Sequence, residues 1–182
     1  MGLFSKRIPR RKFLAVTRAI AGALREQCDP WFRAMMSDEE SIGVRWRTRT
    51  LAGEVLHHLN MLQLSVVACS FRDGGFLQPR DSTFILEWLC GLLTGDVPRN
   101  VRSEIERFLQ YGRPDTPESL RAWASAVAPL IAEPDSGQTA NQLEKWLPLV
   151  VSKAMIATYE ACGDERTARK FRTVWTGPKL MT

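Results

Sequence analysis

The sequence predicts an all-α protein: a compact, single-domain bundle of about seven or eight helices that carries a basic N-terminal arm. Apolar residues recur at helical spacings of three and four along most of the chain. Capping residues, glycines and prolines separate these stretches. The only segment with a strand-like alternation is 44–50, and a length of 182 residues suits one domain with a substantial core.

Charge divides the chain into an arm and a body. The first twelve residues hold five basic groups and no acid, and these are Lys6, Arg7, Arg10, Arg11 and Lys12. The rest of the chain holds equal numbers of basic and acidic groups, so the excess positive charge belongs to the N-terminus. We therefore divide the chain into a basic arm (residues 1–9), a helical domain (10–177) and a C-terminal tail (178–182).

The first helix is expected over residues 10–27, where the apolar spacing is helical and alanines favour it. Asp29 and Pro30 should end it, because the residue before a proline is driven out of the helical region. Ser37 and Glu40 then form a capping-box pattern that could start another helix.

The most regular helical segment is 45–71, which Asp73, Gly74 and Gly75 should end. Its apolar residues form one stripe: Leu51, Val55, Leu59, Leu62, Val66 and Cys69. The next helix should begin with Asp81 or Ser82 as its cap. Its expected buried face consists of Phe84, Ile85, Trp88, Leu89 and Leu92.

Four further signals place the helices of the C-terminal half. A helix from Asn100 should end at Gly112, and Thr116 should cap the helix that follows. Thr139, with a glutamine three residues later, is a second capping box and should start a long helix. Asp164 should cap the last helix.

Basic residues interleaved with aromatic residues are the first candidate site, because arginine binds phosphate and tryptophan can stack on a base. They are candidate contacts for an anion or a nucleic acid. Outside the arm they are Arg45, Trp46, Arg47, Arg49, Arg166, Arg169, Lys170 and Arg172. The alternative interpretation is that these are solvated helix faces with internal ion pairs.

Glu54, His57 and His58 are a second, weaker candidate for a polar site. Glu54 and His57 form an E-x-x-H, which in di-iron bundles occurs twice on different helices. The chain has only these two histidines and they are adjacent, which excludes that standard di-iron site. A helical Glu–His pair with a half-buried histidine is the simpler interpretation.

Other motifs do not point to catalysis. The sequence has no P-loop, no G-x-G-x-x-G, no G-x-S-x-G and no H-E-x-x-H. It therefore predicts no catalytic residue, no cofactor and no metal ligand, and it favours a protein that is not an enzyme.

Several sequence features indicate a cytoplasmic protein without a transmembrane segment. No apolar stretch approaches the length of a membrane-spanning helix. The four cysteines are widely spaced, as in a reduced protein. Residues 9–14 resemble a twin-arginine export signal, but Arg18 interrupts the apolar run that should follow.

The favoured function is a helical subunit or adaptor of a larger assembly that acts through protein–protein contacts. The first alternative is a small subunit that binds the nucleic-acid backbone. The second is an enzyme or metal protein that uses Glu54 and His57. The arm could bind protein, nucleic acid or the surface of a membrane. The sequence identifies neither the partner nor the oligomeric state.

Overall fold

The computed structural model describes residues 7–37, 52–95, 101–112, 116–131 and 137–174. These residues form a short 3-10 turn η1 and seven α-helices, with no strand among them. The elements are η1 (Arg10–Lys12), α1 (Phe13–Ser37), α3 (Ala52–Gly74), α4 (Pro79–Thr94), α5 (Val101–Leu109), α6 (Pro117–Ile131), α7 (Gly137–Ala161) and α8 (Glu165–Val174). The predicted all-α bundle is confirmed.

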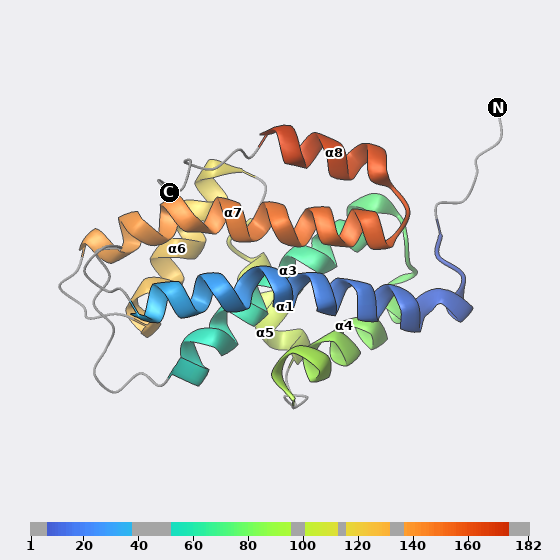
Figure 1. The fold of residues 1–182 in the computed structure, drawn as a ribbon, viewed down its shortest axis with the longest axis horizontal. Helices are drawn as coiled ribbons and strands as arrows, with labels where there is room; N and C mark the ends of the chain where they lie inside the picture. Colours follow the sequence, from blue (N-terminus) through green and yellow to red (C-terminus); the bar gives the residue numbers. More distant parts are fainter. Residues whose placement is uncertain (1–6, 38–51, 96–100, 113–115, 132–136, 175–182) are drawn as a thin grey trace.

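Two central helices, α3 and α7, hold the bundle together (Figure 1). Helix α7 packs against α1, α3, α6 and α8, whereas α3 packs against α4 and α5 as well as α7. Helices α1 and α7 lie side by side and run in opposite directions, and α8 folds back over α7 (Figure 1). The other side of α3 is covered by α4 and α5.

Helix α3 is buried more completely than a single apolar stripe would predict. Every residue from Leu59 to Val67 is buried, including polar residues such as Asn60 and Gln63. The Ser65 hydroxyl donates a hydrogen bond to the Met61 carbonyl at 2.7 Å, which satisfies one of the buried polar groups within the helix. A helix surrounded on all sides needs this kind of internal pairing.

The predicted end of the first helix at Asp29 and Pro30 is wrong, because α1 continues through both residues to Ser37. A proline inside a helix removes one backbone hydrogen bond and strains the preceding turn, yet a long helix that packs along its length can absorb this. Similarly, Pro129 and Pro148 lie inside α6 and α7.

Two predictions for α4 are also wrong: its cap residue and the burial of Phe84. The helix begins at Pro79 with Gln78 as its N-cap residue, and neither Asp81 nor Ser82 is the cap. Proline suits this first position because its fixed φ angle is helical and its missing N–H would have no partner there. Phe84, expected in the core, is 58% exposed, while Ile85, Leu86, Leu89 and Cys90 are buried.

Other helix boundaries follow local capping chemistry. Thr116 caps α6 as expected, since its Oγ1 accepts the Ser119 N–H at 3.2 Å. Asp164 caps α8 in the same way, since its Oδ1 accepts the Thr167 N–H at 3.1 Å. Thr139 is not the cap of α7, because that helix already begins at Gly137.

Part of the N-terminal arm contacts the body of the protein. The Ile8 N–H donates to the Phe76 carbonyl at 2.9 Å, and the Ile8 side chain packs against the core. The Arg10 guanidinium forms an ion pair with Asp81 of α4 at 2.7 Å. Ser37 is the last residue of α1, and the helix expected to follow it, the segment 44–50 and the tail 178–182 lie outside the described residues.

Candidate functional site

The described residues form a groove between α3, α4 and α5. Its volume is about 470 Å³. The walls include Phe71 and Leu77 from the end of α3 and the turn after it, Leu86 from α4, and Ile105 and Leu109 from α5. We call this the α3–α5 groove. Its lining is mainly apolar, so a bound partner would remove apolar surface from water.

Helix packing explains why the groove exists. Helices α4 and α5 each pack more extensively against α3 than against each other. Their facing sides therefore remain apart above the end of α3. The turn after α3 sets the position of α4: Gly75 has a φ of +63°, and Phe76 folds back so that its N–H donates to the Phe71 carbonyl at 3.2 Å.

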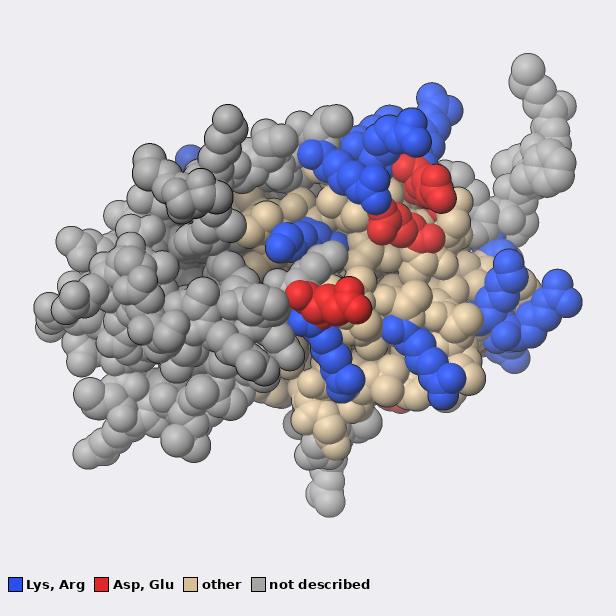
Figure 2. Space-filling view, viewed as in Figure 1, with Lys and Arg blue, Asp and Glu red and all other residues tan. Residues whose placement is uncertain are grey.

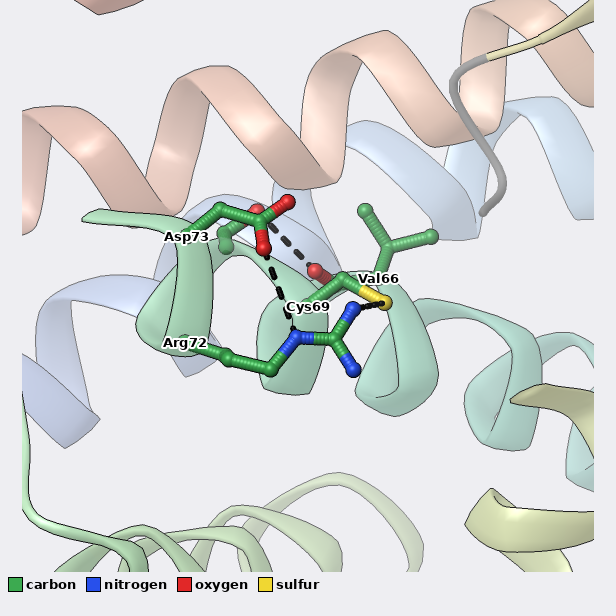
Figure 3. A network of polar contacts seen from close by, with 5 residues as sticks. Val66, Cys69, Arg72 and Asp73 are labelled. Atoms are coloured by element: carbon green, nitrogen blue, oxygen red, sulfur yellow. Dashed lines mark hydrogen bonds and ion pairs between the residues drawn. The ribbon is translucent and has the colours of Figure 1, made fainter. Parts of the chain in front are cut away.

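Charged side chains at the edge of the groove are paired with one another. Arg72 Nε lies 3.3 Å from Asp73 Oδ1, and Arg72 Nη2 donates to Cys69 Sγ at 3.7 Å (Figure 3). Figure 3 shows this guanidinium on the side of α3 that faces away from α7. On α5, Arg102 Nε donates to Glu106 Oε1 at 2.8 Å. That hydrogen bond, with the charge of Glu106, raises the pKa of Arg102.

The groove thus has an apolar interior and an edge of mixed charge. Arg72, Arg102, Glu87 and Glu106 all contribute to its lining. Because the edge carries both positive and negative side chains and holds two ion pairs, it can form hydrogen bonds while its net electrostatic potential stays small. This arrangement resembles the anatomy of a protein interface, which has an apolar centre and a polar rim.

Three cysteines have described side chains: Cys69 in the groove wall, Cys90 in the core and Cys162 just after α7. Cys28 lies outside the part whose side chains are described. Burial, followed by the nearby charge of Asp164, raises the pKa of Cys162 to about 12.

We expect Cys162 to react slowly with iodoacetamide in the folded protein, because the thiolate is the nucleophile and little of it forms below pH 9. The raised pKa also makes stability depend on alkaline pH. Below the unfolded pKa of about 9 both the folded and the unfolded protein carry the neutral thiol; as the pH rises from there towards 12 the fold loses stability, because the unfolded chain releases this proton more readily. Mass spectrometry of alkylated peptides, with and without denaturant, checks the rate. Alkylation of Cys162 at equal rates in folded and unfolded protein would contradict the expectation.

The basic clusters lie on separate parts of the surface. Arg7, Arg10, Arg11 and Lys12 are exposed at the start of α1. The exposed basic residues of α8 are Arg166, Arg169, Lys170 and Arg172, of which Arg172 pairs with Glu160. Figure 2 shows basic side chains over α8 and at the N-terminal end of α1, with acidic and uncharged surface between them. Nucleic-acid binding through these clusters stays a prediction.

Several predicted contacts fall outside the described residues: Lys6, Arg45, Trp46, Arg47 and Arg49. The side chain of Glu54 is also outside them. His57 and His58 are half-buried, and their rings meet edge to face with centroids 5.7 Å apart. Within the described part of the chain, no group of three His, Cys, Asp or Glu side chains is placed to hold a metal ion.

Two exposed apolar side chains lie on neighbouring helices. Phe84 of α4 is 58% exposed and Leu14 of α1 is 38% exposed, and these are the large exposed hydrophobic residues of the described chain. Two contacts join this part of the chain to α4: Arg10 of η1 pairs with Asp81, and Arg25 in the middle of α1 donates to the Leu92 carbonyl. Leu14 lies about 20° around α1 from Arg25, and Phe84 lies about 60° around α4 from Asp81, so both flank the line where the two helices meet. We call this surface the α1–α4 seam.

Comparisons with models of protein families, with curated proteins and with solved structures found no match to this chain. No helix in the described residues has the length and apolar character to cross a bilayer. A function for this chain is therefore inferred from the groove and the seam.

Proposed function

We propose that the protein is a non-enzymatic binding module that receives an amphipathic helix of a partner protein in the α3–α5 groove. The observation that carries this proposal is the groove itself, with apolar walls from three helices and paired charges along its edge. Helix-in-groove recognition uses the same elements, with apolar anchors at positions i, i+3 or i+4, and i+7 of the bound helix.

The groove offers a rigid apolar surface to the apolar residues of a partner helix. Phe71, Leu86 and Ile105 are buried in the walls, so their positions are fixed by the packing of the core. Half-buried Leu77 and Leu109 extend the apolar surface towards solvent. A partner helix would cover mainly Leu77 and Leu109, and the fixed walls beneath them keep the entropic cost of association low.

The edge of the groove suits a peptide with charges of both signs. Arg102 and Glu106 lie one helical turn apart on α5, and both side chains are more than half exposed. A partner helix with its own charged residues beside the apolar anchors could exchange hydrogen bonds with this pair. Such rim contacts contribute more to specificity and register than to affinity.

The charge distribution also distinguishes a helix from a small ligand. A pocket for a small molecule has a few polar groups that converge on the ligand. Here the charged groups pair along the edge, and the Thr83 hydroxyl in the lining donates to the Pro79 carbonyl at 3.4 Å. The interior consequently offers apolar contact along the helices, as an amphipathic helix requires.

Filling the groove should abolish peptide binding. We would select binders from a displayed library of amphipathic helical peptides and measure affinity for the best by fluorescence anisotropy. Thr83→Trp places an indole in the groove lining and should weaken binding by about tenfold or more, which corresponds to roughly 1.4 kcal/mol. Ser125→Trp, at an exposed position on α6, is the matched control and should leave affinity unchanged.

A second variant tests the charged pair at the edge of the groove. Arg102→Glu combined with Glu106→Arg keeps an ion pair on α5 but reverses its direction. It should change which peptides bind while leaving the melting temperature nearly the same. The proposal is wrong if no selected peptide binds, or if the selected peptides bind wild-type protein and Thr83→Trp equally well.

A further inference from the structure

We propose that the α1–α4 seam is a docking surface for an anionic lipid membrane. This surface lies beside the groove on α4, and membrane docking there does not require peptide binding. The seam combines exposed apolar side chains with arginines, which is the combination that peripheral proteins use to hold the headgroup region of a bilayer.

The apolar part of the seam is built around Phe84. Its ring contacts that of Trp88 one turn later, with centroids 6.0 Å apart and the rings tilted by 54°. Trp88 is half-buried, so Phe84 projects beyond it into solvent. An aromatic side chain this exposed suits insertion at the boundary between headgroups and acyl chains.

Helical spacing places basic residues beside these apolar side chains. On α1, Arg18 and Arg25 follow Leu14 by four and eleven residues, so all three lie within about 40° of one another around the helix. On α4, Arg80 precedes Phe84 by one turn. Long arginine side chains can lie along an apolar surface and keep their charged ends among lipid phosphates.

The charge balance of the seam favours an anionic partner. Asp81 lies on this side of α4, but the ion pair with Arg10 neutralises it. Arg11 and Lys12 are exposed at the adjoining end of α1, where they add positive charge. Figure 2 shows basic side chains along α1 as well as at its N-terminal end. Exposed Glu26 and Glu87 lie near these arginines, but the basic residues outnumber the acidic ones, so the seam attracts an anionic surface.

The shape of the seam favours a membrane over a rigid partner. Phe84 and Leu14 project from the outer sides of two neighbouring helices. A lipid surface deforms around such projections, whereas a protein would need a matching pocket. The seam adjoins the groove on α4, because Phe84 lies about 60° around the helix from Glu87 and about 100° from Thr83, both of which line the groove.

Vesicle binding tests the proposal. Full-length protein is floated with phosphatidylcholine vesicles that contain or lack phosphatidylserine. Wild-type protein should bind the anionic vesicles and leave the neutral ones largely unbound. Phe84→Ser should weaken binding by about tenfold, because an inserted aromatic ring is lost. Arg18→Gln with Arg80→Gln should weaken it by about fivefold for each charge. All these positions are exposed, so folding should be retained.

The matched control removes the same number of charges elsewhere. Arg166→Gln with Arg169→Gln on α8 should change vesicle binding much less than the seam variant does. The proposal is overturned if wild-type protein does not prefer anionic vesicles, or if the α8 and seam variants weaken binding equally. It is also overturned if Phe84→Ser has no effect while a single-stranded oligonucleotide competes fully, since the seam would then be a general polyanion site.

Discussion

Shortening Leu62 to alanine is expected to lower the free energy of unfolding by about 2–5 kcal/mol. Leu62 is 1% exposed at the centre of α3, the helix around which α4, α5 and α7 pack. The substitution removes buried methyl groups and leaves a cavity that the surrounding helices can close only in part. Urea denaturation followed by circular dichroism measures the change.

The same substitution at Leu14 provides the control. Leu14 is among the exposed residues of α1, so Leu14→Ala should change the free energy of unfolding by no more than about 0.5 kcal/mol. Equal losses for Leu62→Ala and Leu14→Ala would contradict the assignment of α3 to the centre of the core.

A methyl group at Gly74 is expected to destabilise the protein by about 1–3 kcal/mol, the usual cost of overpacking. A Cβ built at this glycine lies 2.6 Å from Cζ of Phe76, well inside van der Waals contact. The Phe76 ring cannot move freely, because it is buried and packs edge to face against Tyr159 with centroids 5.4 Å apart. Thermal and urea denaturation of Gly74→Ala measure the loss.

Gly22→Ala is the matched control for this prediction. A Cβ at Gly22, inside α1, has no neighbouring atom within 4 Å. Alanine there should stabilise the protein by about 0.5–1 kcal/mol, because glycine is a poorer helix former. The packing account of the turn after α3 is wrong if Gly74→Ala stabilises the protein as much as Gly22→Ala does.

Local sequence signals predicted many of the helix boundaries because the chemistry that sets them is local. The Thr116 and Asp164 side chains bond to N–H groups three residues away, so their roles can be recognised without the fold. The apolar spacing around Leu59 and Leu62 likewise identified residues of the core. Competing local signals misplaced the starts of α4 and α7, and tertiary packing accounts for the errors at Phe84 and Pro30.

Phe84 shows why two adjacent apolar residues of a helix need not both face the core. It precedes Ile85 directly, and both were expected in the core, but neighbouring residues in a helix lie about 100° apart and cannot share a narrow face. The core side of α4 takes Ile85 and Leu89, which leaves Phe84 in solvent. Pro30 is a second case, since α1 continues through a residue that usually ends a helix.

The groove could not be predicted from the sequence, because it is a gap between three helices. Residues that line it, such as Phe71, Leu86 and Ile105, have the helical spacing of ordinary core residues. Only the way in which α4 and α5 pack on α3 leaves part of their apolar sides open. The paired charges of Arg102 and Glu106 likewise look like a solvated helix face in the sequence.

Hydrogen exchange of the intact protein with and without a selected helical peptide tests the central claim most directly. A helix bound in the α3–α5 groove should slow amide exchange in the C-terminal part of α3, in α4 and in α5, with little change in α6 and α8. Slower exchange confined to α6 and α8, with α3, α4 and α5 unaffected by a bound peptide, would contradict the assignment of the groove as the partner site.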